Sequence, residues 1–292
     1  MEELHQDLLR LARRIAPTVR HSIAAATSIG LEPTRTTNQD AFGHLSGRAA
    51  SEGGEWVWSV VCVADGMGGM EAGELASEAA VEAVLDRAAA WFSPRRSPTQ
   101  EEHVQEIRRW AQAANEKVCS ALEGRGARGG CTLVCACLVG RRLAVAHVGD
   151  CRIYLIKDDE IELLTRDHSL PMALVQQGEI PIEAVRSHPD RSRVLRSLGD
   201  RRPMPDYFID SLEQATGAAT MELHPGETLM LCSDGVWEPL NEDSILEIVR
   251  RHRSNLHAAA DSLLAATLGK GAPDNATVLL LRVEESPENE EV

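Results

Sequence analysis

The sequence has little positive charge and few long apolar stretches. Only three of its 292 residues are lysine, and 45 Asp and Glu against 30 Lys and Arg give a formal net charge of −15. Binding of nucleic acids and attachment to anionic membranes both rest on clustered Lys and Arg, so neither is expected. The longest apolar runs, such as Val57–Ala64, have about eight residues, far below the roughly 20 that span a bilayer.

Cysteine pairs and a secretory start are also missing. The seven cysteines include no Cys-x-x-Cys pair, so a structural zinc site is not expected, and buried reduced thiols are predicted instead. The first residues lack the basic start and apolar stretch of a secretory signal. We therefore expect a soluble, cytoplasmic protein.

Apolar residues make up 43% of the chain, which is enough to build a sizeable folded core. Apolar spacing predicts helices over about 4–20, 75–91, 101–122, 241–251 and 255–268, and strands over 23–27, 56–64, 131–139, 142–148, 151–156, 228–233 and 276–283. Strands and helices do not alternate strictly, which disfavours a doubly wound parallel sheet. The pattern favours an α+β fold of antiparallel sheets with helices stacked outside them.

Four aspartates stand where a predicted strand ends or begins. Asp65, Asp150 and Asp234 each follow an apolar run, and Asp274 precedes the last one; a fifth, Asp40, ends a polar segment. Carboxylates that converge would repel one another unless a cation lay between them. Oxygen ligands of this kind select magnesium, manganese or calcium. A single Asp-Gly is ordinarily just a turn, so the shared placement of the four carries the prediction.

Motifs around these aspartates resemble those of the metal-dependent protein phosphatases, the type 2C family, in its bacterial form. Asp65–Gly69 (Asp-Gly-Met-Gly-Gly), followed by Gly73–Ser77, is similar to the family signature. Other segments match family motifs in the same order: Arg35–Asp40, Val148–Arg152, Thr165–Ser169, Arg196–Gly199, Ser233–Trp237 and Asp274–Thr277. The resemblance covers about residues 22–283.

This resemblance implies a four-layer α-β-β-α sandwich of two antiparallel sheets flanked by helix pairs. The catalytic domain would be 22–283, after an N-terminal helical extension, 1–21, and before an acidic disordered tail, 284–292. Within it, 170–195 corresponds to the variable flap beside the active site, a segment suited to contact the protein substrate. The histidines at 147, 168, 188 and 224 are interpreted as structural or surface residues.

The resemblance also implies roles for individual residues. Asp65 would bridge two Mn or Mg ions, with the Gly66 carbonyl on one of them and Asp234 and Asp274 completing the other. Asp150 would hold a third, weaker ion. Asp40 would orient metal-bound waters, and Arg35 would grip the substrate phosphate. Attack by a hydroxide that bridges the metals would then release phosphate from phosphoserine or phosphothreonine, with no cysteine nucleophile.

Three residues depart from the family pattern. Gln39 replaces a glutamate and removes one acidic contact. Met67 replaces a histidine of many eukaryotic members that is thought to protonate the leaving group, so this role would pass to a metal-bound water or another group. Cys151 replaces a serine and is expected to be tolerated in packing.

The leading hypothesis is a phosphatase acting on phosphorylated proteins, including a Ser/Thr kinase or its targets. A second is a degenerate relative that only binds metal or a phosphorylated partner, which the retained Arg35 and aspartates disfavour. A third, a calcium-binding structural domain, is disfavoured because no EF-hand spacing occurs.

Overall fold

The computed structural model describes residues 19–51, 54–92 and 98–286. The predicted leading helix lies almost wholly outside these residues. Its expected end is wrong, because the strand β1 already begins at Val19 and pairs with β11 from there onward. Residues 19–21 therefore belong to the folded domain. At the other terminus β11 continues to Glu285, two residues into the predicted tail.

Two antiparallel sheets form the centre of the molecule. Sheet A has the strand order β1 (Val19–Ser28), β11 (Ala276–Glu285), β10 (Thr228–Cys232), β7 (Arg152–Ile156) and β8 (Ile161–Leu163). Sheet B has the order β2 (Asp40–Ser51), β3 (Gly54–Met67), β5 (Leu133–Val139), β6 (Arg142–Val148) and β9 (Met221–Glu222), and the short β4 (Gly130–Cys131) pairs with the end of β3.

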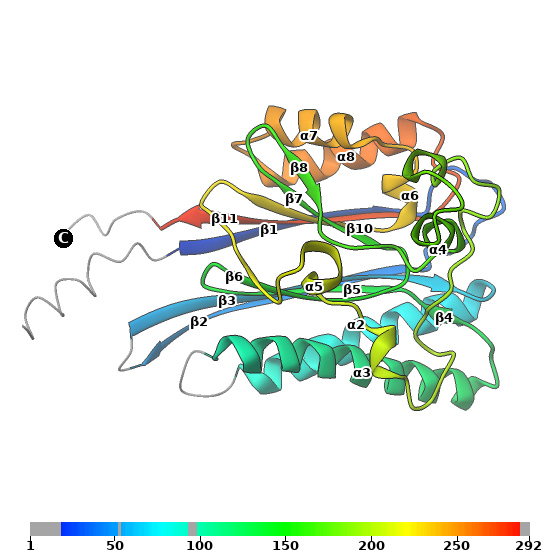
Figure 1. Ribbon diagram of the computed structural model, residues 1–292, viewed down its shortest axis with the longest axis horizontal. Coiled ribbons are helices and arrows are strands. Elements are labelled where there is room, and N and C mark those ends of the chain that lie inside the picture. The colour runs from blue at the N-terminus through cyan, green and yellow to red at the C-terminus, as the bar shows by residue number, and fades with distance from the viewer. Residues whose placement is uncertain (1–18, 52–53, 93–97, 287–292) are drawn as a thin grey trace, which may run out of the picture.

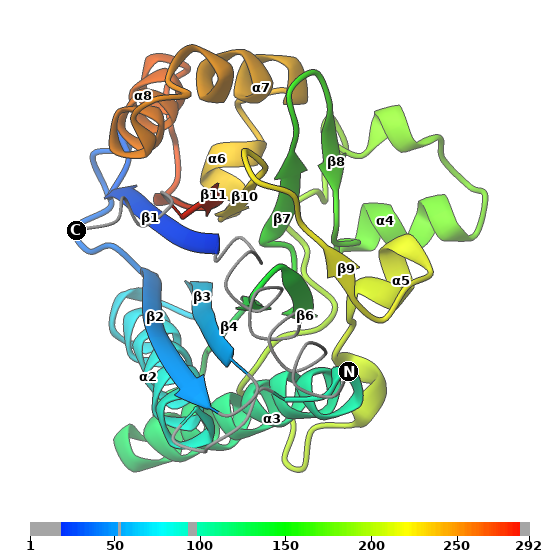
Figure 2. The same cartoon turned by 90° about the vertical axis from the view of Figure 1, so that its left-hand side faces the viewer.

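Helices cover the outer face of each sheet (Figure 1). On sheet B these are α2 (Met70–Trp91) and α3 (Gln100–Arg125); on sheet A they are α6 (Asp234–Trp237), α7 (Glu242–Arg251) and α8 (Leu256–Gly269). The view along the strands in Figure 2 shows the resulting stack of helices, sheet A, sheet B and helices. The shorter helices are α4 (Leu170–Gln176), η1 (Ile182–Ala184), η2 (Asp206–Phe208) and α5 (Leu212–Thr216). The predicted α-β-β-α sandwich is confirmed.

The apolar runs of the sequence are continuous because both faces of the central strands are buried. In β3, Val61 and Val63 pack between the sheets, whereas Val60 and Cys62 pack toward α2 and α3. β10 and β11 alternate in the same way between sheet B and the helices α6–α8. All seven cysteines are free and buried, as predicted.

The edge strand β2 was not predicted, because its residues are small or polar rather than alternating. Glycine is required there at two places: a Cβ on Gly43 would approach Val81 and Leu85 of α2 to within 2.8 Å, and one on Gly47 would overlap Trp58.

α3 is also longer than predicted, running from a Thr99 capping box to Arg125. None of the helices within the described ranges is long and apolar enough to cross a membrane.

Candidate metal centre

The strand ends that carry the predicted aspartates meet at one end of the sandwich. Asp65 lies at the end of β3, Asp150 follows β6, Asp234 opens α6 directly after β10, and Asp274 precedes β11. Asp40, the first residue of β2, pairs with Asp65 in the register of sheet B. This end lies beside α4, α6 and β4, at the right of Figure 1.

A pocket of about 230 Å³ opens between these strand ends. It is lined by Arg35, Gln39, Asp65, Gly66, Met67, Asp150, Ser192, Val194, Asp234 and Asp274. The structure therefore brings together six of the seven predicted site residues. The seventh, Asp40, does not line the pocket, but it is close enough for its charge to raise the pKa of Asp65.

Burial and mutual repulsion dominate the electrostatics of this acidic cluster. Burial, followed by the charges of Asp40, Asp234 and neighbouring aspartates, raises the pKa of Asp65 well above its ordinary value. Burial and the nearby charge of Asp150 raise the pKa of Asp234 in the same way. Burial is also the main cause that raises the pKa of Asp40 to about 6 and that of Asp150 to about 7.

Two carboxylate oxygens of this cluster lack hydrogen-bond partners although they are buried. They are Oδ1 of Asp40 and Oδ1 of Asp234, whereas Oδ2 of Asp40 accepts a hydrogen bond of 2.7 Å from Ser233 Oγ. A buried oxygen without a donor is unfavourable, and a divalent cation would satisfy it. As placed, no three His, Cys, Asp or Glu side chains of the described residues converge closely enough to hold one ion by themselves.

Arg35 is the one cation among the pocket-lining residues, and it pairs with Asp274. Its Nη2 lies 2.6 Å from Asp274 Oδ2, and its Nε donates to the carbonyl of Pro273 at 3.2 Å. Burial raises the pKa of Asp274, although the guanidinium opposes this rise. Arg35 therefore already lies at the edge of the pocket, next to a predicted metal ligand.

The glycines beside the aspartates are required for close packing. A Cβ on Gly66 would come within 2.1 Å of the Gly73 carbonyl oxygen, and a Cβ on Gly235 within 1.9 Å of the Asn275 carbonyl oxygen. Neither glycine has a positive φ. β3 continues through Gly66 to Met67, and Gly235 lies within α6, so close packing rather than a left-handed backbone conformation requires glycine at both positions.

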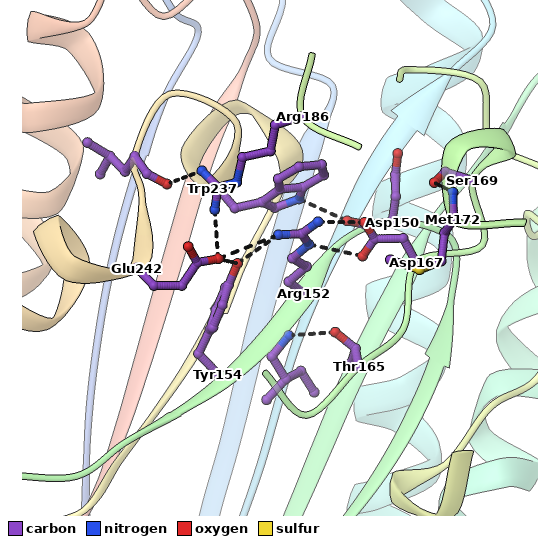
Figure 3. A network of polar contacts seen from close by, with 12 residues as sticks. Asp150, Arg152, Tyr154, Thr165, Asp167, Ser169, Met172, Arg186, Trp237 and Glu242 are labelled. Atoms are coloured by element: carbon purple, nitrogen blue, oxygen red, sulfur yellow. Dashed lines mark hydrogen bonds and ion pairs between the residues drawn. The ribbon is translucent and has the colours of Figure 1, made fainter. Parts of the chain in front are cut away.

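A buried arginine fixes the segments that carry Asp150 and Asp234 (Figure 3). Arg152 donates from Nε and Nη2 to both carboxylate oxygens of Asp167, at 3.0 and 2.7 Å, and from Nη1 to Tyr154 Oη at 3.0 Å. Its guanidinium lies 3.5 Å from the centre of the Trp237 ring. The indole Nε1 of Trp237 donates to the carbonyl of Asp150 at 2.9 Å. One side chain thus joins β7, the loop before the flap, and α6.

Sequence reasoning did not find this network, although Arg152 belongs to a quoted motif. The only signal in the sequence was an arginine two residues after Asp150, at the start of an otherwise apolar strand. His168 is structural, as interpreted: its Nδ1 accepts a hydrogen bond from the Gly149 amide at 3.1 Å, so it supports the residue before Asp150. None of the histidines in the described ranges lines the pocket.

The departures from the family pattern have local explanations. Gln39 donates from Nε2 to the Gly69 carbonyl at 2.9 Å, a bond that a glutamate could not make. The Cys151 thiol lies 3.1 Å from Thr132 Oγ1, and that hydroxyl also accepts from the Asp65 amide. Met67 lines the pocket and offers no proton.

Two cysteines stand six residues before an arginine, the spacing of the phosphate loop in cysteine phosphatases. They are Cys119, which precedes Arg125, and Cys135, which precedes Arg141. Cys119 lies in helix α3 and Cys135 in strand β5, so neither forms a loop. Burial raises the pKa of both thiols and disfavours the reactive thiolate. Neither cysteine lines the pocket between the strand ends.

Comparison with known proteins supports the assignment made from the motifs. A family model described as Protein phosphatase 2C matches residues 34–269. The chain belongs to this family. It is similar to the serine/threonine phosphatase stp of Listeria innocua, with 34% identity over 227 residues, 76% of this chain and 83% of the relative. It is also similar to the protein phosphatase PhpP of Streptococcus pneumoniae, with 31% identity over 271 residues, 90% of this chain and 98% of the relative.

Solved structures of the family share the fold. The crystal structure of the serine/threonine phosphatase PstP/Ppp of Mycobacterium tuberculosis has a TM-score of 0.73 and 27% identity, over 91% of this chain and 99% of that one. A structure of the catalytic domain of PstP contains two manganese ions; it has a TM-score of 0.71 and 26% identity, over 92% of this chain and 100% of that one.

Proposed function

We propose that this chain is a metal-dependent protein serine/threonine phosphatase, which hydrolyses phosphoserine and phosphothreonine in protein substrates. The observation that carries the proposal is the pocket at the strand ends, where Asp65, Asp150, Asp234 and Asp274 gather with a single arginine. Similar chains are named serine/threonine phosphatases, and a related catalytic domain was solved with two manganese ions.

The residues of the pocket fit a pair of divalent cations. Hard oxygen donors predominate, and an aspartate oxygen with no partner lies buried on Asp234. Asp65 and the Gly66 carbonyl would hold one ion, while Asp65, Asp234 and Asp274 would hold the second. Mn and Mg both suit this donor set, and Asp150 would hold a third, weaker ion. Waters would complete the coordination of each ion, as is usual for Mg²⁺.

The bound ions would lower the pKa of a water, so that hydroxide is available at neutral pH. This hydroxide would attack phosphorus in line with the leaving oxygen. Asp40, which accepts a hydrogen bond from Ser233, would orient waters through its oxygen that has no partner. Arg35 would offer paired donors to the phosphate oxygens and stabilise their growing negative charge. Since Met67 cannot donate, the proton for the leaving serine or threonine oxygen would come from a water.

Hydrolysis of a phosphothreonine peptide with Mn²⁺, with and without a chelator, tests the proposal. Turnover that requires Mn²⁺ and is lost in Asp65→Asn and Asp234→Asn supports it. The alternative of a binding protein without activity predicts instead that the peptide binds in the presence of Mn²⁺ and is released unchanged. A phosphorylated Ser/Thr kinase is the natural protein substrate to assay after the peptide.

A further inference from the structure

The flap, residues 170–195, forms one wall of the pocket through Ser192 and Val194. Its base is closed by backbone hydrogen bonds from Leu170 to Arg193 and from Leu195 to His168, at 2.9 and 2.7 Å. Between these points the flap contains only α4, the single turn η1 and bends, and it pairs with neither sheet. Side-chain contacts must therefore set how its outer part lies over the pocket.

Two arginines of the flap bind the short connection between α6 and α7 and the first residue of α7. Arg186 donates from Nη1 to the Leu240 carbonyl at 2.9 Å and from Nη2 to Glu242 Oε1 at 2.7 Å. Arg191 donates from Nε to Glu238 Oε2 at 3.2 Å. We call Arg186 and Arg191 the flap clamp. The connection that they hold begins directly after α6, the helix that opens with Asp234.

The clamp also contacts the buried network around Asp150. Oε1 of Glu242, which accepts from Arg186, also accepts from Tyr154 Oη at 3.4 Å, and Tyr154 in turn accepts from Arg152 (Figure 3). Arg152 stacks on Trp237, whose indole binds the Asp150 carbonyl. A continuous chain of contacts thus leads from the flap to the floor of the pocket.

Each ion pair of the clamp is open to solvent. The side chains of Arg186 and Glu242 are 31% and 42% exposed, and those of Arg191 and Glu238 are 45% and 22% exposed. Pairs of this kind stabilise a structure only modestly. The clamp can therefore hold the flap in one position without preventing it from adjusting to a bulky substrate.

We propose that Arg186 and Arg191 are specificity-determining positioning residues, which set the flap as a docking wall for the peptide around a phosphorylated residue. This inference rests on the proposed phosphatase function. A phosphopeptide extends beyond the carboxylates and reaches the wall formed by Ser192 and Val194. A small aryl phosphate needs only the floor of the pocket, so its hydrolysis does not depend on the clamp.

The double variant Arg186→Ala/Arg191→Ala tests the clamp against two substrates in Mn²⁺. We expect the KM of a phosphothreonine peptide to rise about five- to tenfold, because two exposed ion pairs are lost. The kcat and KM for p-nitrophenyl phosphate should stay within about twofold of their original values. The single variant Arg186→Lys should have a lower KM for the peptide than the single variant Arg186→Ala, because lysine can still pair with Glu242. Arg250→Ala, which removes an exposed pair with Asp159 elsewhere on the surface, is the matched control.

Amide hydrogen exchange gives a readout that does not depend on activity. In the double variant we expect faster exchange across residues 182–195, with the strands of both sheets unchanged. Equal loss of activity on both substrates, or unchanged exchange over 182–195, would overturn the proposal. Absence of any turnover in the unmodified protein would instead contradict the phosphatase function. The exchange measurement would still test whether Arg186 and Arg191 hold the flap in place.

Discussion

Asp167 and Asp65 are both aspartates near strand ends, but only Asp167 has a cation beside it. Arg152 gives Asp167 two hydrogen bonds, and both side chains are almost completely buried, with 5% of Arg152 and 1% of Asp167 exposed. Asp65 instead lies near Asp40, Asp150, Asp234 and Asp274, whose charges add to the effect of burial and raise its pKa. The difference separates an acid that stabilises the fold from acids that need a ligand.

This comparison bears on what each carboxylate does to stability. A buried ion pair is costly to break, because the remaining partner is left as an uncompensated charge. A cluster of like charges is itself unfavourable, so removing one member relieves repulsion. The same substitution, Asp to Asn, should therefore have opposite consequences for folding at the two positions.

The largest expected effect is on catalysis in Asp65→Asn. We expect kcat/KM to fall on the order of 10⁴-fold, about 5 kcal/mol of transition-state stabilisation, because the residue common to both proposed cation sites is lost. The stability of the metal-free protein should not fall, because a repelling charge is removed. Turnover of a phosphopeptide and urea unfolding measure the two quantities, and a loss of stability in the metal-free variant would break the comparison.

The next effect is on folding in Asp167→Asn. We expect a loss of about 3–5 kcal/mol of unfolding free energy, because the buried Arg152 would lose its carboxylate. Urea unfolding without metal checks this value. Asp159→Asn is the matched control, since its pair with Arg250 is 81% and 53% exposed and should contribute less than about 1 kcal/mol. Similar losses in both variants would mean that the buried pair of Asp167 with Arg152 stabilises the fold no more than an exposed pair does.

The sequence was sufficient to predict the acids of the pocket, but not the acids and cations that support them. The strand-end position of Asp65, Asp150 and Asp234 can be recognised because an apolar run stops at each. The pairing of Arg152 with Asp167 and the stacking on Trp237 join residues far apart in the chain, and no local pattern records such contacts. Periodicity likewise predicted the central strands, whose faces are both buried, and missed β2, whose glycines accommodate α2 and Trp58.

A smaller effect is expected from Mn²⁺ on the stability of the unmodified protein. At about 100 times its dissociation constant, an ion that binds only the folded state adds about 2.7 kcal/mol, or roughly 5–10 °C in Tm for a chain of this size. Thermal unfolding with and without Mn²⁺ measures the shift. The increase in Tm with Mn²⁺ should be smaller in Asp65→Asn and unchanged in Asp159→Asn. An equal increase in both variants would mean that the ion binds at another site.

The smallest effect is the pH dependence of the metal-free protein. Asp150, with a pKa of about 7, and Asp65 and Asp234, with pKa values raised further above the ordinary range, bind protons more tightly in the folded than in the unfolded state. The stability that these three groups contribute is therefore fully present below the unfolded pKa of about 4 and is lost as the pH rises through the folded values. Buried histidines such as His147, with a lowered pKa, oppose this trend only below about pH 6.5.

The interval from pH 6.5 to 8 thus isolates the carboxylates of the pocket. We expect the unfolding free energy of the metal-free protein to fall there by on the order of 1 kcal/mol, as measured by urea unfolding at several pH values. Saturating Mn²⁺ should abolish the slope, because the cations replace the protons. A metal-free protein whose stability is constant from pH 6.5 to 8 would mean that Arg35 already compensates the cluster, and the contrast between the two kinds of aspartate would fail.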